Sequence, residues 1–168
     1  MTETTTKMFR PFNLPVEFGI RSLYIFAAVA PQRLDVHRLS YLDYLLIHSA
    51  DVVDGPPSLH APVPNRGGEW LVKRQILESG INLMIERELL SKYFDETGIS
   101  YSSTNLTLPF IDLLKSVYAT ELKKRATWLR DNFSSMPLSE LEHFMVSNLR
   151  KWGAEFKRES LFRGPSDG

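Results

Sequence analysis

The 168-residue chain has the length of about one domain, and its 43% apolar and 24% charged residues are ordinary for a protein with a packed core. Twenty Lys and Arg against twenty Asp and Glu give zero net charge, so no overall field attracts nucleic acid or acidic membranes. The lack of Cys excludes disulfides, thiol nucleophiles, iron–sulfur clusters and the common structural zinc sites.

An extended arm and two helices are expected at the start of the chain. Prolines at positions 11 and 15 predict extended backbone over residues 1–14. Apolar residues recur at three- and four-residue steps over residues 16–30, and Pro31 stops that pattern. The same spacing predicts a second helix over residues 35–49, with Asp35 as its N-cap.

A loop rich in proline and glycine separates the second helix from the third. Residues 51–68 contain four Pro and three Gly, a composition that fits neither a helix nor a central strand. Loops longer than about 12 to 15 residues inside a compact domain tend to be functional or disordered. Because proline stiffens the backbone, the composition favours a functional loop.

A third helix and a hairpin complete the order that is typical of a winged helix. A helical pattern runs over residues 69–85, with Gly80 as its weak point, the position at which this helix can bend or break. Two β-capable runs, residues 89–94 and 99–103, flank a glycine-bearing turn and predict a hairpin, which must pack against the helices because an isolated hairpin is marginal in water. We therefore expect a mainly α-helical fold with a small β-hairpin, whose winged-helix-like core of three helices and a wing spans residues 15–107.

Two further helices are expected to extend this core over residues 108–163. Pro109 at a first-turn position begins a long apolar pattern that ends near Phe133, which predicts one continuous helix. Pro137 begins the second helix of the extension. The last residues, 164–168, are expected to form a frayed tail.

Winged helices often read nucleic acid with their third helix, but the charge expected on that surface here is low. Arg66, Lys73 and Arg74 supply three cations, where strong binders neutralise about six to ten phosphates. The hairpin tip carries Asp95-Glu96, which repels phosphate, and the run Lys123-Lys124-Arg125 is more typical of a solvated helix face than of a patch that follows a phosphate backbone. The pattern favours a winged fold that docks on protein over one that reads DNA. The candidate nucleic-acid contacts are Arg66, Lys73, Arg74, Lys123 and Lys124.

No convincing catalytic or cofactor-binding motif is found in the sequence. The two His and two Asp residues that fall within thirteen positions around the loop are His48, Asp51, Asp54 and His60. Such a set can ligate a divalent metal in a small hydrolase, but its spacing matches no metal motif, so hydrogen-bonded packing is the favoured interpretation. The chain also has neither a nucleophile elbow nor a phosphate-binding glycine loop, and we expect no catalytic residue, metal or cofactor.

The sequence also bears on membranes and on compartment. No apolar run approaches the length that a membrane-spanning helix needs, and the first seven residues are polar. We therefore expect a cytoplasmic protein that makes no contact with a membrane.

Three large aromatic side chains fall late in the chain, at Trp152, Phe156 and Phe162. Either they fold back onto the core, which is the commoner arrangement, or they anchor a partner protein. The sequence pattern leaves both interpretations open.

Several runs of the sequence together resemble the middle component of bacterial ABC three-component systems, closest to the accessory subunit of Lamassu-type antiphage defence. The resemblance extends from about residue 10 to residue 163, and the runs are more specific together than any one of them. The runs that carry it are Arg10-Pro11-Phe12-Asn13, Tyr41-Leu42-Asp43-Tyr44-Leu45-Leu46-Ile47-His48-Ser49, Gly55-Pro56-Pro57-Ser58-Leu59-His60, Gly68-Glu69, Leu71-Val72, Pro109-Phe110-Ile111-Asp112, Trp152-Gly153-Ala154-Glu155-Phe156 and Glu159-Ser160.

This resemblance implies a non-catalytic subunit that works beside an SMC or Rad50-like ATPase and an effector, often a nuclease. The subunit would dock on the ATPase and help hold the effector inactive until foreign DNA is engaged, with DNA contacted indirectly through the complex. The resemblance also implies partner contacts in two matched runs, at Pro56, Pro57, Leu59, His60, Trp152 and Phe156. The alternative function is a winged-helix DNA-binding regulator.

Overall fold

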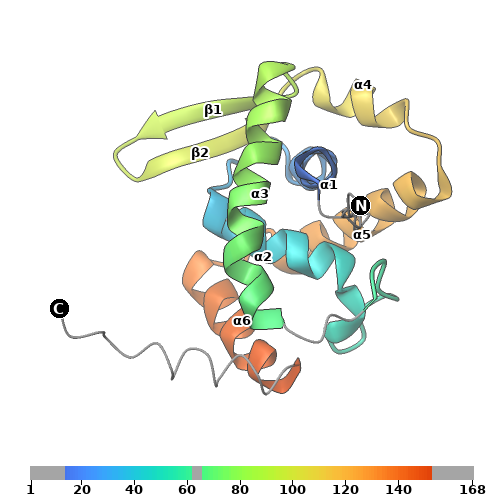
Figure 1. The fold of residues 1–168 in the computed structure, drawn as a ribbon, viewed down its shortest axis with the longest axis vertical. Helices are drawn as coiled ribbons and strands as arrows, with labels where there is room; N and C mark the ends of the chain where they lie inside the picture. The colour runs from blue at the N-terminus through green and yellow to red at the C-terminus, as the bar shows by residue number, and fades with distance from the viewer. Residues whose placement is uncertain (1–13, 62–65, 153–168) are drawn as a thin grey trace, which may run out of the picture.

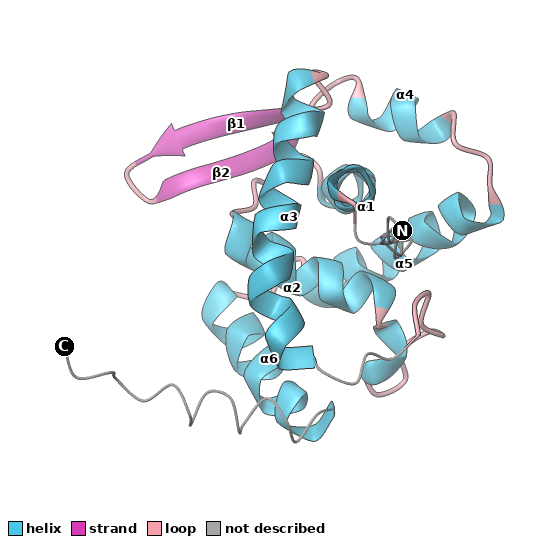
Figure 2. Cartoon of the chain, in the orientation of Figure 1, coloured by secondary structure: helices cyan, strands magenta, loops and turns pink. Residues whose placement is uncertain are grey.

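The computed structural model of the chain describes residues 14–61 and 66–152, which form a mainly helical fold with a two-stranded antiparallel hairpin, as the sequence predicts (Figures 1 and 2). The predicted arm up to residue 13 and the predicted tail lie outside the described residues. The elements are α1 (Pro15–Val29), α2 (Val36–Ile47), the short 3-10 helix η1 (Ser49–Asp51), α3 (Arg66–Glu86), β1 (Leu90–Asp95), β2 (Gly98–Ser103), α4 (Thr107–Asp112), α5 (Val117–Phe133) and α6 (Leu138–Trp152).

The first three helices pack around one core, and α3 crosses α1 closely at a pair of glycines (Figure 1). A Cβ atom added to Gly80 would lie 2.4 Å from the Pro15 carbonyl oxygen and 2.7 Å from the Gly19 nitrogen. α3 does not break at Gly80, because the helix runs without interruption from Arg66 to Glu86. The missing side chain instead lets two helix backbones approach each other.

The hairpin is fixed to the helices at its base. Leu34, in the link between α1 and α2, exchanges two backbone hydrogen bonds with Tyr101 of β2, at 2.9 and 2.8 Å between nitrogen and oxygen. Leu90 and Tyr101 at the base are buried, whereas the facing pair Phe94 and Ile99 near the tip is exposed. The extra bridge and the buried base provide the packing that an isolated hairpin lacks.

Two predicted boundaries are wrong around the proline- and glycine-rich stretch. The sequence predicts that the second helix runs to residue 49, but α2 ends at Ile47 and η1 occupies residues 49–51. The third helix, α3, begins at Arg66, three residues before the expected start at position 69. Gly67 and Gly68 therefore lie in the first turn of α3. A glycine in a helix costs only about 1 kcal/mol relative to Ala, so two glycines do not prevent the chain from being helical there.

The predicted continuous helix from Pro109 to Phe133 is also wrong, because the chain leaves the helical path after Asp112 and begins α5 at Val117. The Ser116 hydroxyl accepts a hydrogen bond from the Ala119 amide at 3.0 Å and caps α5. Apolar spacing continues across the break, which is why the periodicity suggested one helix, but a Ser at an N-cap competes with that continuation.

α5 and α6 complete the same hydrophobic core as the first three helices. α5 packs against both α1 and α2, and α6 packs against α2. Leu122, Leu129 and Phe133 of α5 and Leu141 and Met145 of α6 are all buried in that core. The described helices therefore share one apolar interior.

Candidate functional site: a braced loop and an adjoining pocket

The loop of residues 55–60, which we call the 55–60 loop, is held against the helices by main-chain contacts. The Pro57 carbonyl accepts hydrogen bonds from Ser49 Oγ at 3.1 Å and from Arg125 Nε of α5 at 3.0 Å. The amides of Leu59 and His60 both donate to the Ile47 carbonyl, at 2.9 and 3.1 Å. These contacts give a proline-rich loop a defined shape.

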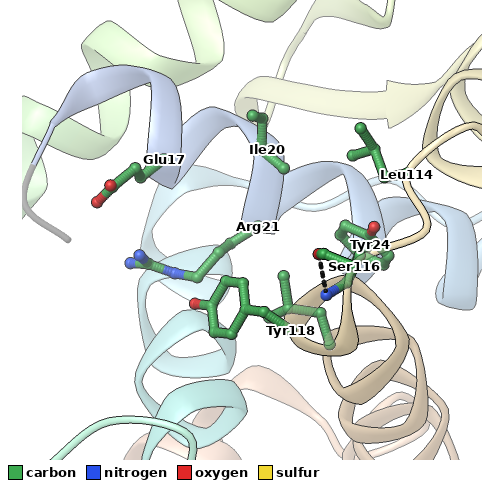
Figure 3. Close-up of a pocket in the computed structure, with 9 residues that line it drawn as sticks. Glu17, Ile20, Arg21, Tyr24, Leu114, Ser116 and Tyr118 are labelled. Atoms are coloured by element: carbon green, nitrogen blue, oxygen red, sulfur yellow. Dashed lines mark hydrogen bonds between the residues drawn. The ribbon is translucent and has the colours of Figure 1, made fainter. Parts of the chain in front are cut away.

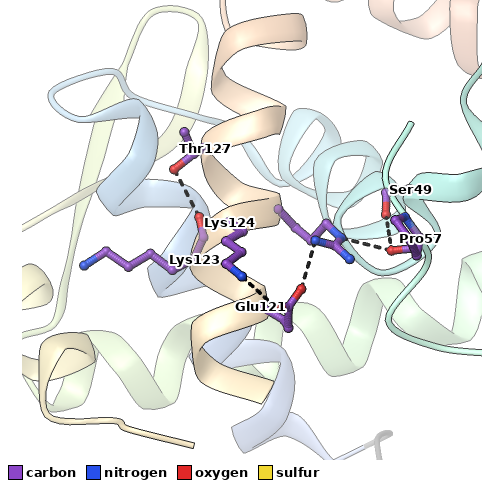
Figure 4. A network of polar contacts seen from close by, with 7 residues as sticks. Ser49, Pro57, Glu121, Lys123, Lys124 and Thr127 are labelled. Carbon is purple, nitrogen blue, oxygen red and sulfur yellow. Dashed lines mark hydrogen bonds and ion pairs between the residues drawn. The ribbon is translucent and has the colours of Figure 1, made fainter. Parts of the chain in front are cut away.

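Arg125 is itself held in position by its own helix. Its Nη1 donates to Glu121 Oε2 at 3.1 Å, and Lys124 Nζ donates to Glu121 Oε1 at 3.0 Å. Figure 4 shows this network running from Lys124 through Glu121 toward Pro57 and Ser49. The hydrogen bond from Lys124, together with the nearby positive charges, lowers the pKa of the Glu121 carboxyl. The brace therefore reaches from a surface lysine to the loop.

His60 at the end of the loop contacts α5 through Tyr118. His60 Nε2 lies 2.8 Å from the Tyr118 hydroxyl oxygen, and the two ring centroids are 6.0 Å apart. Burial, and next the positive charge of Arg21, lower the pKa of His60 to about 4. His60 is therefore a neutral imidazole at pH 7 and acts as a hydrogen-bonded packing residue.

A buried ion pair joins α1 to α2 beside this contact. Arg21 donates from Nε and Nη2 to the two carboxylate oxygens of Asp43, at 2.8 and 2.9 Å, and its side chain is only 2% exposed. Burial by itself disfavours the guanidinium charge, but Asp43 more than offsets it and raises the pKa of Arg21. Figure 3 shows Arg21 of α1 and Tyr118 of α5 pointing toward each other. The ion pair therefore lies beside Tyr118, the α5 residue that His60 of the 55–60 loop contacts.

A pocket of about 280 Å³ lies next to this pair, between α1 and the start of α5 (Figure 3). Glu17 Oε2 and the Tyr24 hydroxyl are buried here, and neither has a hydrogen-bond partner within the described part of the chain. The residues that line the pocket are Glu17, Ile20, Arg21, Tyr24, Leu114, Ser116, Tyr118, Ala119 and Leu122. The wall of the pocket is therefore mainly apolar.

The structure places the six predicted partner contacts differently. In the 55–60 loop, Pro57 is exposed, Pro56 is partly exposed, and Leu59 packs against the core. Trp152 is the last residue of α6, whereas Phe156 and Phe162 lie outside the described residues. Pro57 is thus the member of this set that is exposed among the residues that the structure describes, whereas Pro56, Leu59 and His60 are partly buried.

Three of the five predicted nucleic-acid contacts are paired with carboxylates. Lys123 Nζ lies 3.0 Å from Asp112 Oδ1, Lys124 Nζ lies 3.0 Å from Glu121 Oε1, and Arg74 Nε lies 3.5 Å from Glu78 Oε1. Of the other two, Lys73 is half-buried on α3, and Arg66 begins α3. The paired lysines and arginine present less positive charge to phosphate than their sequence positions suggest.

The His and Asp residues around the loop do not converge into a metal site. Asp51 accepts a hydrogen bond from the Tyr44 hydroxyl at 2.6 Å, and Asp54 is exposed. Within residues 14–61 and 66–152, no three His, Asp or Glu side chains are grouped so that they could hold a metal ion. In the same ranges, no helix combines the length and the apolar character that crossing a bilayer requires.

Sequence analysis assigned no site role to Arg21, Asp43 or Tyr118, and the prediction that Arg125 lies on a solvated helix face is wrong, because Arg125 is buried and bonds to the Pro57 carbonyl. These four residues bring the loop, the ion pair and the pocket together. A signal was present at two of them, because Arg21 and Asp43 each interrupt an apolar stretch of a predicted helix. Charged residues in such positions are rarely buried without a partner. The partners are 22 residues apart along the chain, a separation that no local pattern reports.

Comparison with known proteins identifies the family. The model of the family described as ABC-three component (ABC-3C) system Middle Component 2 matches residues 11–155, which include every helix and strand described above. No curated protein and no solved structure matches the chain. The family match confirms the resemblance to a middle component. The chain belongs to the Middle Component 2 family of ABC-three component systems.

Proposed function

We propose that this chain is a non-catalytic accessory subunit of a cytoplasmic antiphage defence complex, closest to the Lamassu type. It docks on an SMC/Rad50-like ATPase and helps hold a nuclease effector inactive until foreign DNA is sensed. The observation that carries the proposal is the family match over residues 11–155, because a middle component belongs to a system of several components.

The geometry supports docking through a preformed surface. The 55–60 loop accepts hydrogen bonds from η1 and α5 and donates two to the Ile47 carbonyl of α2, so Pro56 and Pro57 are held in place before a partner arrives. Binding then orders little additional chain, which lowers the entropic cost of association. The polar side chains beside the loop, Arg125, Glu121 and Lys124, bond to one another and to the loop. This arrangement is consistent with a surface that recognises a protein.

The proposal is tested by co-expression with the ATPase and the effector encoded beside this chain. Wild-type chain is expected to co-elute with the ATPase in size-exclusion chromatography. The double variant Pro56→Asp/Pro57→Asp adds two charges to the loop and is expected to weaken binding at least about tenfold, because charges at an interface core are poorly tolerated. The control Ser135→Asp/Ser139→Asp adds the same charge at exposed positions near α6 and should bind as wild type does. Failure of the wild-type chain to co-elute with either protein would refute the proposal.

A second candidate function is the winged-helix DNA-binding regulator, which the order of three helices and a hairpin favours. This function requires an affinity of the isolated chain for duplex DNA that falls steeply with salt and weakens when Lys73 and Arg74 are both changed to Gln. The ion pairs of Arg74, Lys123 and Lys124 argue against it. Salt-independent or absent binding in a fluorescence-anisotropy titration would exclude it.

A further inference from the structure

The hairpin has an open edge on the outer side of β1. In the antiparallel pair, Lys92 of β1 lies opposite Tyr101 of β2. Tyr101 turns both its N–H and its carbonyl toward Leu34, with which it exchanges two hydrogen bonds. Facing residues of an antiparallel pair either bond to each other through both groups or both turn these groups away from each other. The backbone N–H and carbonyl of Lys92 therefore point away from β2.

The same alternation applies to Phe94, two residues further along β1, which lies opposite Ile99. Among residues 14–61 and 66–152, the sheet has two strands, and no backbone hydrogen bond from another element reaches Lys92 or Phe94 (Figure 1). Lys92 is exposed, and Phe94 is 73% exposed. Two amides and two carbonyls on this edge are thus available to one more strand.

A cavity of about 590 Å³ adjoins this edge at the base of the hairpin. It lies between β1, the end of α3 and residues 104–106, which lead from β2 to α4. Lys92 and Tyr93 line it from β1, and Ile85 and the 44% exposed Leu106 line it from the other two segments. A strand that followed β1 toward the base of the hairpin would reach this cavity with one of its side chains.

The side chains along the edge indicate which strand fits it. Lys92 Nζ lies 5.1 Å from the centre of the Phe94 ring, and it pairs with no carboxylate in the described part of the chain. Phe94 and Ile99 form an exposed apolar pair near the tip. Opposite charges and apolar pairs stabilise facing positions of neighbouring strands. The complementary strand therefore carries an acidic residue beside Lys92 and an apolar residue beside Phe94.

A second copy of this chain fits the edge poorly. In β1 of another copy, the residues that turn their backbone groups outward, and so could lie opposite Lys92, are Leu90, Lys92 and Phe94, none of which is acidic. The antiparallel register that pairs all three places the two Lys92 side chains directly opposite each other, which is destabilising. The charge of the edge thus favours a different protein.

We propose that the outer edge of β1 binds an extended segment of a protein partner, which adds a third strand to the sheet and places an acidic residue beside Lys92. The inference rests on the proposed function, in which the partner is another subunit of the complex. The segment donates to the carbonyls of Lys92 and Phe94 and accepts from their amides. In strand addition, main-chain hydrogen bonds of this kind supply the affinity, and the alternating side chains supply the specificity.

The first experiment compares Phe94→Pro with Phe94→Ala by biolayer interferometry of the full-length chain against the co-expressed ATPase and effector. Both variants remove the ring, but only proline removes the outward N–H. Phe94→Pro is expected to bind at least about fivefold more weakly than Phe94→Ala, because a carbonyl of the partner loses its hydrogen bond. Equal binding of the two variants would overturn the inference and leave the proposed function standing. A wild-type chain that bound neither protein would refute both.

A charge reversal tests the same edge without changing the backbone. Lys92→Glu is expected to weaken binding at least about tenfold, because it places two carboxylates beside each other. The matched control is Lys115→Glu, the same change at an exposed lysine between α4 and α5, and it should bind as wild type does. The melting temperature of each variant should equal that of wild type, and if Phe94→Pro lowers it, Lys92→Glu decides alone. Wild-type affinity of Lys92→Glu would overturn the inference.

Hydrogen exchange reports on the backbone itself. In the isolated chain, the amides of Lys92 and Phe94 should exchange faster than those of Ser91 and Tyr93, which point toward β2. In the complex, exchange over residues 90–95 should slow, while exchange over residues 98–103 stays unchanged. Slow exchange of Lys92 and Phe94 in the isolated chain, or no change in the complex, would overturn the inference. So would a dimer of the isolated chain in analytical ultracentrifugation that Phe94→Pro abolishes, because a second copy would then occupy the edge.

Discussion

At the scale of single residues, the buried Arg21–Asp43 pair is the polar interaction whose loss we expect to lower stability most. Both side chains are almost completely buried and bond to each other through two hydrogen bonds. Removing two charges from water is costly, and their attraction recovers that cost only while both partners are present. The pair therefore stabilises the contact between α1 and α2 only while both charged side chains are present.

Asp43→Ala is expected to lower the free energy of unfolding by about 3–5 kcal/mol, because it leaves a buried guanidinium without a counter-ion. The double variant Arg21→Met/Asp43→Leu should recover most of that loss, since apolar side chains of similar size replace the pair. Urea denaturation followed by circular dichroism measures both. Lys123→Gln breaks the exposed pair with Asp112 and, as the control, should cost less than about 1 kcal/mol. Equal losses for the single and the double variant would contradict this account.

His60 links stability to pH. Its pKa is about 4 in the folded chain and about 6.5 in the unfolded chain, so between these values only the unfolded state binds the proton. Stability should therefore rise as the pH rises from 4 to 6.5, and the contribution of His60 is about 1 kcal/mol after allowance for its partial exposure. His60→Gln should reduce the slope of unfolding free energy against pH in that window and leave the slope above pH 7 unchanged. A variant with the wild-type slope throughout would show that His60 does not carry this dependence.

At the scale of elements, the crossing of α1 and α3 depends on two glycines. A Cβ at Gly80 would meet backbone atoms of α1 at distances that no side chain can relieve by rotating. Alanine is the better helix former by about 1 kcal/mol, but overpacking costs about 1–3 kcal/mol, and here the obstacle is main chain. Packing outweighs propensity at this position.

Gly80→Ala is accordingly expected to destabilise the chain by about 1–2 kcal/mol, measured as a lower urea midpoint with an unchanged m-value. Ser79→Ala, at the neighbouring exposed position of α3, should change stability by less than about 0.5 kcal/mol. A stabilising effect of Gly80→Ala would mean that the two helices can move apart at little cost.

Apolar periodicity predicts α1, α2 and α6 well because each of them buries a continuous face in the core. The same periodicity fails between α4 and α5, where Leu113 and Val117 keep the spacing of a helix but face solvent. There the Ser116 hydroxyl supplies a cap that spacing alone does not register. Pattern reasoning is thus reliable where burial determines the element and unreliable where a hydrogen bond ends one.

For the candidate site, the 55–60 loop is identified as a special segment from its composition, but its partners are not. His60 contacts Tyr118, which is 58 residues away, and Pro57 contacts Arg125, which is 68 residues away. These contacts require α5 to lie packed against α1 and α2. The composition of the sequence therefore predicts the loop, whereas the residues that hold it in place can be identified only from the tertiary structure.

At the scale of the whole molecule, the shared core of α1, α2, α3, α5 and α6 should make the described part of the chain unfold as one unit. Helical circular dichroism and tryptophan fluorescence are expected to follow a single, coincident transition in urea. Trp128 of α5, partly buried against the core, reports on the C-terminal helices. Two separated transitions would show that α5 and α6 form a unit independent of the winged-helix-like core.

The main-chain attachment of the 55–60 loop has one further consequence. Ser49 and Arg125 donate to the carbonyl oxygen of Pro57, and two amides of the loop donate to the carbonyl oxygen of Ile47. All four hydrogen bonds are thus accepted by backbone carbonyl oxygens, which every amino acid possesses. Exchanging the side chains at positions 56 and 57 therefore leaves these main-chain hydrogen bonds available. Substitutions at these two positions can therefore adapt the loop to a different binding protein while the helices that support it stay unchanged.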